Sequence, residues 1–238
     1  GHLSVGEAFR TIQRGDADLA IAGGAETLIS PMGMMRRQLL GRLTSETDPA
    51  AAVRPFDETA TGTVVAEGGA LLILEDADHA KARGATVYAE VAGFGAAQDP
   101  HDPALPDPDG VSYSLAIKNA LADAGIAAAD IDAIVPHGLG IAHHDASELA
   151  GLRRVFDDLT KPTLCPIKSQ TGDASAGCAI DLAAAALATH TGTLPPAMNT
   201  TRDDLNVSPE ARTTSPSHVL ASTFGMGGQN AAVIFRKP

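Results

Sequence analysis

Apolar residues along the chain follow two rhythms, one typical of amphipathic helices and one typical of buried strands. At the start, Leu3, Val5, Phe9 and Ile12 have the spacing of a helix that buries one face. The short apolar run at 18–22, closed by two glycines, then has the length of a buried strand. The opening pattern therefore predicts a helix followed by a strand.

The next part of the chain predicts further strands separated by irregular segments. Residues 30–60 are rich in Met and Arg and then in polar residues and proline, which predicts an irregular excursion. Strands are expected at 70–74 and 86–94, with a short helix at 79–84 between them, and the two strands are expected to pair as neighbours. Four prolines among aspartates predict a loop at 97–110.

Alternation of helix and strand continues to the end of the chain. Apolar positions from Ile117 to Ala124 keep helical spacing, and Gly125 is placed as a C-terminal cap. The further expected elements are a strand at 131–135, a helix after His144, a strand at 163–167, a helix at 174–190, and strands around Val219 and Val233. This order is typical of a layered α/β fold.

Composition indicates an ordinary globular protein. The 238 residues are 44% hydrophobic and 19% charged, enough to bury one large core or two modest ones. Aromatic residues make up only 3%, which favours close aliphatic packing. Because 29 acids outnumber 17 Lys and Arg, the net charge of -12 argues against nucleic acid as a partner.

Cysteine content and hydropathy bear on location. Cys165 and Cys178 lie in segments like those of a cytosolic enzyme, so we expect both to be reduced. No apolar run approaches the roughly 20 residues that span a bilayer, and the start lacks the features of a signal peptide, so no membrane association and a cytoplasmic location are expected. Helical rhythm at Gly1 without an initiating Met leads us to expect that the chain begins inside an element.

Four local patterns occur in order along the chain. They are Pro55-Phe56-Asp57 followed by Glu67-Gly68; His137-Gly138 with Asp145 and Glu148 downstream; Lys168-Ser169-Gln170-Thr171-Gly172-Asp173; and Phe224-Gly225-Met226-Gly227-Gly228-Gln229-Asn230. Together with the segment 16–24, they resemble the β-ketoacyl synthase family over essentially the whole chain. The resemblance implies a thiolase-like layered αβαβα fold, of which this chain supplies roughly the C-terminal half. Residues 1–95 would end the first thiolase-like half, and 96–238 would form the second.

The resemblance also implies a set of catalytic residues. His137 matches a catalytic histidine that donates a hydrogen bond to a thioester oxygen as enolate charge develops. Lys168 matches a lysine whose cation would hold nearby acids such as Glu67 ionised, as a buried brace. Without the resemblance, these three residues would be interpreted as a strand-end histidine bonded to local backbone, a surface lysine and a turn glutamate.

The C-terminal motif implies a substrate-binding loop. Phe224 matches a gating phenylalanine, and Gly225 and Gly227 would let backbone N–H groups approach a thioester carbonyl as part of an oxyanion hole. Met226 replaces a second aromatic residue, which should soften the pocket wall. By itself, the segment would be interpreted as a glycine-rich hairpin turn.

Asp173 departs from the family pattern, because decarboxylating members carry a second histidine at this position. An ionised carboxylate cannot donate a hydrogen bond and would repel an enolate, which puts decarboxylation in doubt. The plain alternative is that Asp173 is the N-cap of the helix expected at 174–190. The residues alone leave both readings open.

No residue of the chain fits the expected nucleophile, a cysteine at a helix N-terminus. The resemblance places that cysteine a few residues upstream of Gly1. Cys165 and Cys178 are interpreted as small buried hydrophobic residues. Neighbouring His143 and His144 would point in different directions, so no metal site is expected, and neither is a cofactor.

Three hypotheses follow for function. The first is acyl transfer and Claisen condensation with a malonyl-type unit on acyl carrier protein, in fatty acid or polyketide synthesis. Its partners would be the carrier, the N-terminal half of the same synthase, and a second subunit in a homodimer or heterodimer, with Arg36, Arg37 and Arg42 as a basic patch for the acidic carrier. The second is a catalytically silent subunit similar to chain-length factors, which Asp173 favours. The third is a thiolase-like acyltransferase that does not decarboxylate.

Overall fold

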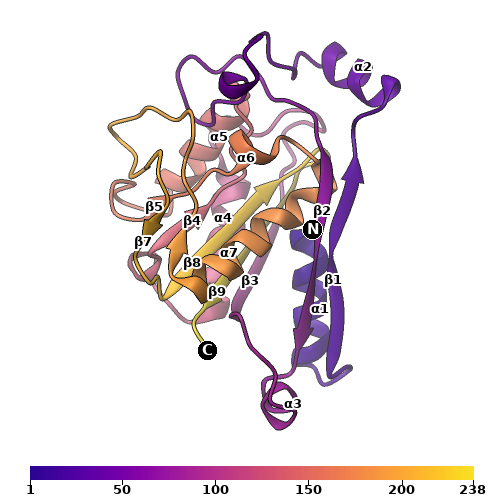
Figure 1. The fold of residues 1–238 in the computed structure, drawn as a ribbon, viewed down its shortest axis with the longest axis vertical. Helices are drawn as coiled ribbons and strands as arrows, with labels where there is room; N and C mark the ends of the chain where they lie inside the picture. The colour runs from indigo at the N-terminus through magenta and orange to yellow at the C-terminus, as the bar shows by residue number, and fades with distance from the viewer.

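The computed structural model describes all 238 residues (Figure 1). The α-helices are α1 (His2–Gln13), α2 (Pro31–Leu39), α3 (Ala77–Ala82), α4 (Val111–Ala124), α5 (Ala142–Arg153), α6 (Lys168–Thr171) and α7 (Ala179–Thr191). The strands are β1 (Leu19–Thr27), β2 (Glu67–Glu75), β3 (Glu90–Gln98), β4 (Ala133–Val135), β5 (Thr163–Leu164), β6 (Thr193–Leu194), β7 (Arg212–Thr213), β8 (His218–Phe224) and β9 (Gln229–Arg236). Short 3-10 helices lie at Pro49–Ala51, Ala128–Asp130 and Ser175–Cys178. None of the helices combines the length and apolar character needed to cross a bilayer.

The largest sheet has five strands in the order β3-β9-β8-β4-β5. Strand β4 is parallel to both β5 and β8, whereas β9 is antiparallel to β3 and β8. Strands β1 and β2 form a separate antiparallel pair over nine residues, and β6 and β7 form a third, very short pair. The parallel strands β4, β5 and β8 therefore all end at the same edge of the main sheet.

Two cores lie on opposite faces of the five-stranded sheet. On one face, Ile117 of α4 and Leu152 of α5 pack with Ile234 of β9. On the other face, Val5 of α1 and Leu182 of α7 pack in a cluster that also includes residues of β2. Since side chains alternate across a strand, one sheet supplies both cores. The layers are thus α4 with α5, the main sheet, α1 with α7, and the β1–β2 pair, as Figure 1 shows.

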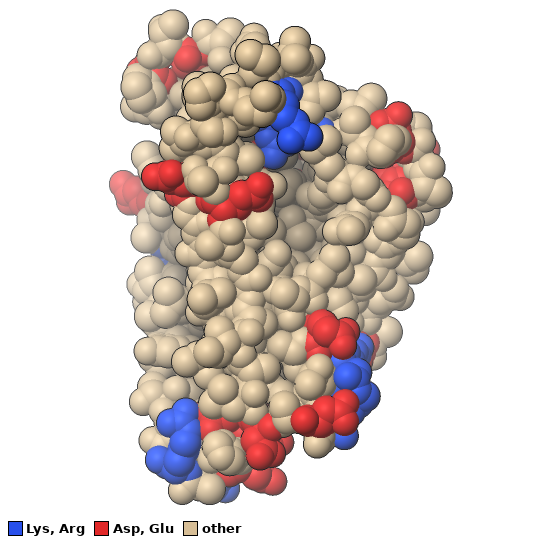
Figure 2. All heavy atoms as spheres, turned by 90° about the vertical axis from the view of Figure 1, so that its right-hand side faces the viewer, with Lys and Arg blue, Asp and Glu red and all other residues tan.

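The outer face of the β1–β2 pair is apolar and exposed. Leu19, Ile21, Leu71 and Ile73 are 45%, 66%, 69% and 66% exposed, while their strand neighbours turn inward toward α1 and α7. Figure 2 shows this side of the molecule with a broad uncharged middle between charged ends. An apolar face of this kind marks a contact surface.

Two expected features of the fold need correction. Strand β3 runs from Glu90 to Gln98 and hydrogen-bonds to β9 in the main sheet, not to β2, which pairs with β1 in a separate sheet. A strand that we assigned largely to the first thiolase-like half thus lies in the main sheet, and the division between 95 and 96 stays a prediction. The segment 30–60 also contains a helix, α2, whose N-cap Ser30 accepts a hydrogen bond from the Gly33 amide.

Other expectations from the sequence pattern are confirmed. Helix α4 ends at Gly125, which has a left-handed φ of +68° and acts as the C-cap. The strands predicted around Val219 and Val233 are β8 and β9. The helix predicted at 174–190 is in part a 3-10 turn, so that α7 itself begins at Ala179.

Candidate active site

Three of the predicted site residues lie at the ends of the parallel strands. His137 follows β4, Lys168 comes shortly after β5, and Phe224 is the last residue of β8. Because the carboxyl ends of parallel strands meet at one edge of a sheet, the topology gathers these side chains. A cavity of about 320 Å³ opens at this edge and is lined by His137, Phe224 and Asp173, among others.

The loop after β4 is held by two buried carboxylates of α5. Glu148 accepts hydrogen bonds from the amides of His137 (2.7 Å) and Gly138 (2.8 Å), and from the hydroxyl of Tyr113 (2.6 Å). Asp145 accepts from the amides of Leu139 (3.0 Å) and Gly140 (3.1 Å), as well as from Phe56. The backbone around His137 is thereby fixed from the helix below it.

Sequence reasoning noted Asp145 and Glu148 but gave them no role. Their spacing was the available signal, since residues three apart share a helix face and both fall in the first two turns of α5. Burial raises the pKa of Asp145 to about 8 and that of Glu148 to about 7, while the amide donors act in the opposite direction. They are positioning residues, because they reach the cavity only through the His137 loop.

His137 is held as a neutral imidazole. Its ring is almost fully buried, and Nδ1 lies 3.0 Å from the hydroxyl oxygen of Thr223. Burial is the main cause that lowers the pKa of His137 well below its ordinary value, and the cation of Lys168 adds to it. At neutral pH the ring therefore carries one proton, which it can donate only through one nitrogen.

Phe224 lies at the centre of a cluster of rings. Its ring centroid is 4.7 Å from that of His137, 5.7 Å from that of His144, and 5.7 Å from that of Tyr113. The contact with His144 is stacked, at an interplanar angle of 21°. Movement of Phe224 would therefore change the packing of both histidines.

His144 predicts a measurable acid sensitivity. Burial lowers its pKa to about 3, and its buried Nδ1 has no hydrogen-bond partner. Below the unfolded-state pKa of about 6.5, His144 binds a proton in the unfolded chain but stays neutral in the folded chain. The free energy of unfolding therefore decreases as pH falls. Replacing His144→Phe keeps a ring against Phe224 and removes this loss. The difference in unfolding free energy between variant and wild type should shift by about 1 kcal/mol in favour of the variant from pH 6 to pH 5.

Urea unfolding of the complete protein at the two pH values measures this effect. Comparing variant with wild type cancels the other titrating groups. The exposed His101 provides a control for replacing a histidine by phenylalanine outside the ring cluster of Phe224. Equal pH dependence in wild type and His144→Phe would show that His144 titrates normally when folded.

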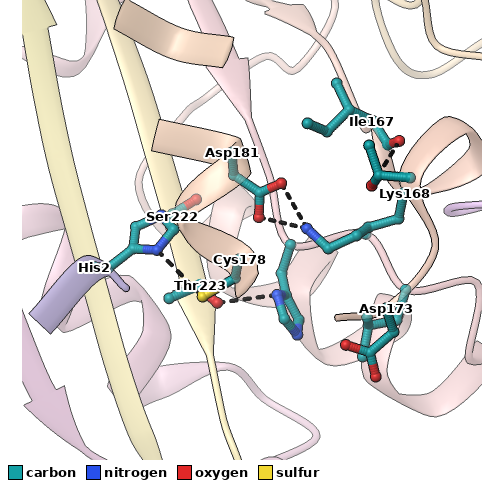
Figure 3. A network of polar contacts seen from close by, with 12 residues as sticks. His2, Ile167, Lys168, Asp173, Cys178, Asp181, Ser222 and Thr223 are labelled. Atoms are coloured by element: carbon teal, nitrogen blue, oxygen red, sulfur yellow. Dashed lines mark hydrogen bonds and ion pairs between the residues drawn. The ribbon is translucent and has the colours of Figure 1, made fainter. Parts of the chain in front are cut away.

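Lys168 is a buried cation, but its partner is not the residue that we expected. Its Nζ donates to both carboxylate oxygens of Asp181, at 2.6 Å for Oδ1, and both side chains are almost fully buried. Glu67 is instead exposed at the start of β2, where its carboxylate accepts from Thr27. Figure 3 shows Lys168 directed toward Asp181, with Asp173 lying apart from the pair. The predicted Lys168–Glu67 brace is therefore wrong.

Asp173 lies in the cavity wall and does not cap α7. Its Oδ1 accepts from the Ser175 amide at 2.8 Å, which closes a local turn, whereas the N-cap position of α7 is Cys178. Its backbone is fixed by bonds to Val64 and Ala66, and Oδ2 lies 4.0 Å from the Arg37 guanidinium. A fixed carboxylate thus faces the cavity at the position where we expected the family pattern to place a histidine.

The glycine-rich loop after Phe224 uses most of its own amides. Gly225 N–H donates to Gln229 O (2.8 Å) and Gly227 N–H donates to Pro103 O (2.7 Å). The amide of Met226 makes no backbone hydrogen bond, and its side chain is half exposed. Of the amides that we proposed as oxyanion donors, those of Gly225 and Gly227 are engaged, which leaves Met226 as the available donor in this loop.

The two cysteines are free and differ in their surroundings. Cys165 is fully buried, which raises the pKa of its thiol to about 12. Cys178 is partly buried, lies at the cavity wall, and has its Sγ 3.8 Å from Nδ1 of His2, as Figure 3 shows. No group of three or more His, Cys, Asp or Glu side chains is arranged to hold a metal ion.

The expected basic patch does not form at the surface. Arg36 is exposed, but Arg37 and Arg42 are only 9% and 6% exposed and line the cavity. Arginine is rarely buried without a partner, so its usual preference for solvent predicted the wrong place for both side chains. Sequence reasoning thus missed two cations of the candidate site.

Comparison with known families gives two adjacent matches. The N-terminal domain of beta-ketoacyl synthase matches residues 1–80, and the C-terminal domain of beta-ketoacyl synthase matches residues 88–201. The chain is 35% identical over 245 residues to 3-oxoacyl-(acyl-carrier-protein) synthase 2 of Coxiella burnetii, and 33% identical over 244 residues to the protein of the same name from Staphylococcus aureus. It covers 59% of the length of each of these relatives.

Solved structures of ketosynthases share the fold. The ishigamide ketosynthase/chain length factor superposes with a TM-score of 0.92 at 32% identity, over the whole of this chain and 58% of that one. A ketosynthase bound to a hexaketide and to its type II acyl-carrier protein superposes with a TM-score of 0.94 at 29% identity, over 60% of that chain. A beta-ketoacyl synthase from Burkholderia phymatum gives 0.89 at 31% identity, over 59% of its chain.

Proposed function

Because this chain belongs to the β-ketoacyl synthase family, with the thiolase-like fold, we propose that the complete protein transfers acyl groups between thioesters and condenses them with a malonyl-type unit on acyl carrier protein. The pathway would be fatty acid or polyketide synthesis, as the names of its relatives suggest. The observation that carries the proposal is His137, a neutral imidazole held at the cavity beside the Phe224 loop.

The contact between His137 and Thr223 supports a donor role. If the Thr223 hydroxyl donates to Nδ1, the single proton of the neutral ring is on Nε2. Nε2–H then donates to a thioester oxygen on which enolate charge develops. Glu148 holds the backbone of His137 by accepting a hydrogen bond from its amide, and Asp145 holds the next residues of the loop by accepting from the Leu139 amide.

The proposed reaction has two steps. A cysteine thiolate, which we expect upstream of Gly1, attacks an acyl thioester; a new C–S bond forms, and the carrier leaves as a thiol after taking up a proton. The malonyl-type unit then loses CO2, the electrons of the broken C–C bond form an enolate, and its carbon attacks the acyl-enzyme. A β-ketoacyl thioester forms, and the cysteine thiolate is released.

Two further groups support these steps. The Met226 amide is free to donate to a thioester oxygen, and Phe224 would gate the cavity through its contacts with His137 and His144. The cation of Lys168, which hydrogen-bonds to Asp181, favours the neutral form of His137. Glu67 has no part in this arrangement.

Asp173 favours a second candidate function, a catalytically silent subunit of the chain-length-factor kind. A carboxylate at this position supplies no donor to an enolate and repels it when ionised. One of the similar solved structures is described as a ketosynthase together with a chain length factor. A thiolase-like transferase that does not decarboxylate would also be compatible with Asp173.

Partners of the complete protein follow from its surface and from its relatives. We propose that the N-terminal part of the synthase covers the exposed apolar face of β1 and β2, since its four large side chains need a contact surface. A second synthase subunit and the acyl carrier protein complete the assembly. Carrier docking through Arg37 and Arg42 is not part of this proposal, since both are buried.

Intact mass spectrometry tests the proposal. The complete protein is incubated with a long-chain acyl thioester, and any adduct is located by peptide mapping. An acyl adduct on a cysteine upstream of Gly1 would support the transferase. An adduct only on Cys178 would place the chemistry elsewhere in the cavity, and absence of any adduct on the folded protein would favour the silent subunit.

A further inference from the structure

Two buried guanidinium groups border the cavity without a full set of partners. Arg42 donates to the carbonyl of Ala104 at 2.6 Å, and Arg37 has Met226 Sδ at 3.5 Å, a weak acceptor. The carboxylate of Asp173 lies 4.0 Å from Arg37, beyond hydrogen-bond distance. A guanidinium has five N–H donors, so most of the donors of this pair remain available toward the cavity.

The other charged groups around the cavity do not hydrogen-bond to the pair. Both carboxylate oxygens of Asp99 accept amide hydrogens, from His101 (2.9 Å) and Asp107 (2.8 Å). Asp102 accepts from the amides of Ala104 and Leu105 within its own turn. The three histidines of the cavity wall, His2, His137 and His144, all have pKa values lowered by burial and add no charge at neutral pH.

The two arginine side chains lie close enough for the charge of one to affect the other. Burial and the charge of Arg37 lower the pKa of Arg42, and Asp173 only partly offsets this. Asp99, Asp102 and Asp173 also line the cavity, so the two guanidiniums are set apart by their unused N–H donors and not by an excess of charge. Buried charges of this kind are normally paired, and arginine is the side chain best suited to grip a planar oxyanion with two parallel hydrogen bonds.

We propose that Arg37 and Arg42 form an anion-binding subsite that takes the carboxylate of a carboxyl-bearing acyl thioester. This inference rests on the proposed function, because it assumes that the cavity accepts thioesters. The carboxylate is favoured over a phosphate because the cavity wall already holds three carboxylates, which disfavour a dianion more than a monoanion, and because planar carboxylates fit the guanidinium fork.

The subsite would have a chemical consequence. A carboxylate held by guanidiniums is stabilised as an anion, and loss of CO2 removes the group that they bind. The subsite therefore favours binding of the intact carboxyl-bearing unit over its decarboxylation. This agrees with the presence of a carboxylate, Asp173, at the position where an enolate-stabilising donor is expected.

Binding of two matched amides to the complete protein tests the subsite. The probes are malonyl-pantetheine with the thioester sulfur replaced by NH, and its methyl ester, in which one added methyl group removes the charge. Isothermal titration should give a Kd for the carboxylate about 10-fold or more below that of the ester, since a charge-assisted hydrogen bond contributes on this scale. Arg37→Met and Arg42→Met should each reduce this preference to about 3-fold or less.

Controls separate the possible outcomes. Arg36→Met changes the exposed neighbour on the same helix and should keep the full preference. Because Arg42→Met also loses the hydrogen bond to Ala104, thermal unfolding checks its fold, and Arg37→Met gives an independent result.

Equal binding of both amides to the wild type would overturn the proposed carboxylate subsite but would still be compatible with a thioester-binding cavity. Binding of neither would count against the proposed function itself. A preference for 4′-phosphopantetheine over both amides, lost in the arginine variants, would replace the carboxylate by a phosphate and overturn the proposal as stated.

Discussion

Replacing Lys168→Met in the complete protein should lower its unfolding free energy by about 3–5 kcal/mol. The variant leaves the Asp181 carboxylate buried without its only cation, since Lys168 Nζ is the donor to both of its oxygens. Isolated buried charges are costly, whereas the intact pair is worth little more than a good apolar contact. Lys168→Met/Asp181→Val should therefore recover most of the loss. Urea unfolding monitored by circular dichroism measures all three proteins.

Two further substitutions make this result interpretable. Lys161 is exposed, so Lys161→Met should stay within about 0.5 kcal/mol of wild type. Glu67→Gln tests the partner that the sequence suggested and should also have little effect, because Glu67 is exposed and bonds only to Thr27. A large loss in Glu67→Gln, together with a small one in Lys168→Met, would contradict the pairing of Lys168 with Asp181.

The sequence predicted the framework of the site because local pattern determines it. A strand of three buried residues, β4, precedes His137, and β8 ends at Phe224, as the apolar runs indicated. Parallel pairing of such strands then brings their ends together without any long-range information beyond the layered α/β order. The capping glycine at 125 was predictable for the same reason, because its left-handed φ is a local requirement.

The partners of the charged residues could not be predicted in the same way. Asp181 lies 13 positions after Lys168 and reaches it only because a turn and a 3-10 segment reverse the chain before α7. Glu67 was chosen for its place in a motif, but its strand begins at the exposed edge of the β1–β2 pair. Which acid meets a buried lysine depends on tertiary packing, and the sequence pattern carries no signal for it.

The segment 30–60 contains a local sequence signal for the start of a helix. Ser30 followed by Pro31 is a strong helix start, with a side-chain cap and a proline in the first turn, and α2 begins there. Recognising α2 would still not have revealed the burial of Arg37 and Arg42, because their shielding comes from the loop at Ala104 and from Met226. Contacts between distant segments decide this part of the cavity.

Replacing Asp173→His should raise the rate of malonyl decarboxylation by about 100-fold, the contribution of one donor to a developing oxyanion. The new imidazole would lie close to Arg37, whose charge favours the neutral ring, so it could donate a proton to the enolate oxygen beside His137. The measurement is the release of labelled CO2 from malonyl-acyl carrier protein by the complete protein, with thermal unfolding to confirm that the variant is folded after losing the Ser175 bond.

Two variants separate the new donor from the mere loss of a negative charge. Asp173→Ala removes the repulsion and adds no donor, so it should give about a tenth of the gain or less. In the Asp173→His background, His137→Ala should remove most of the gain, because both rings would act on the same oxyanion. If Asp173→His is folded and still forms the acyl adduct but releases CO2 no faster than wild type, Asp173 is not what limits decarboxylation. The guanidiniums of Arg37 and Arg42, which are proposed to hold the carboxylate of the malonyl unit, would then be the stronger restraint.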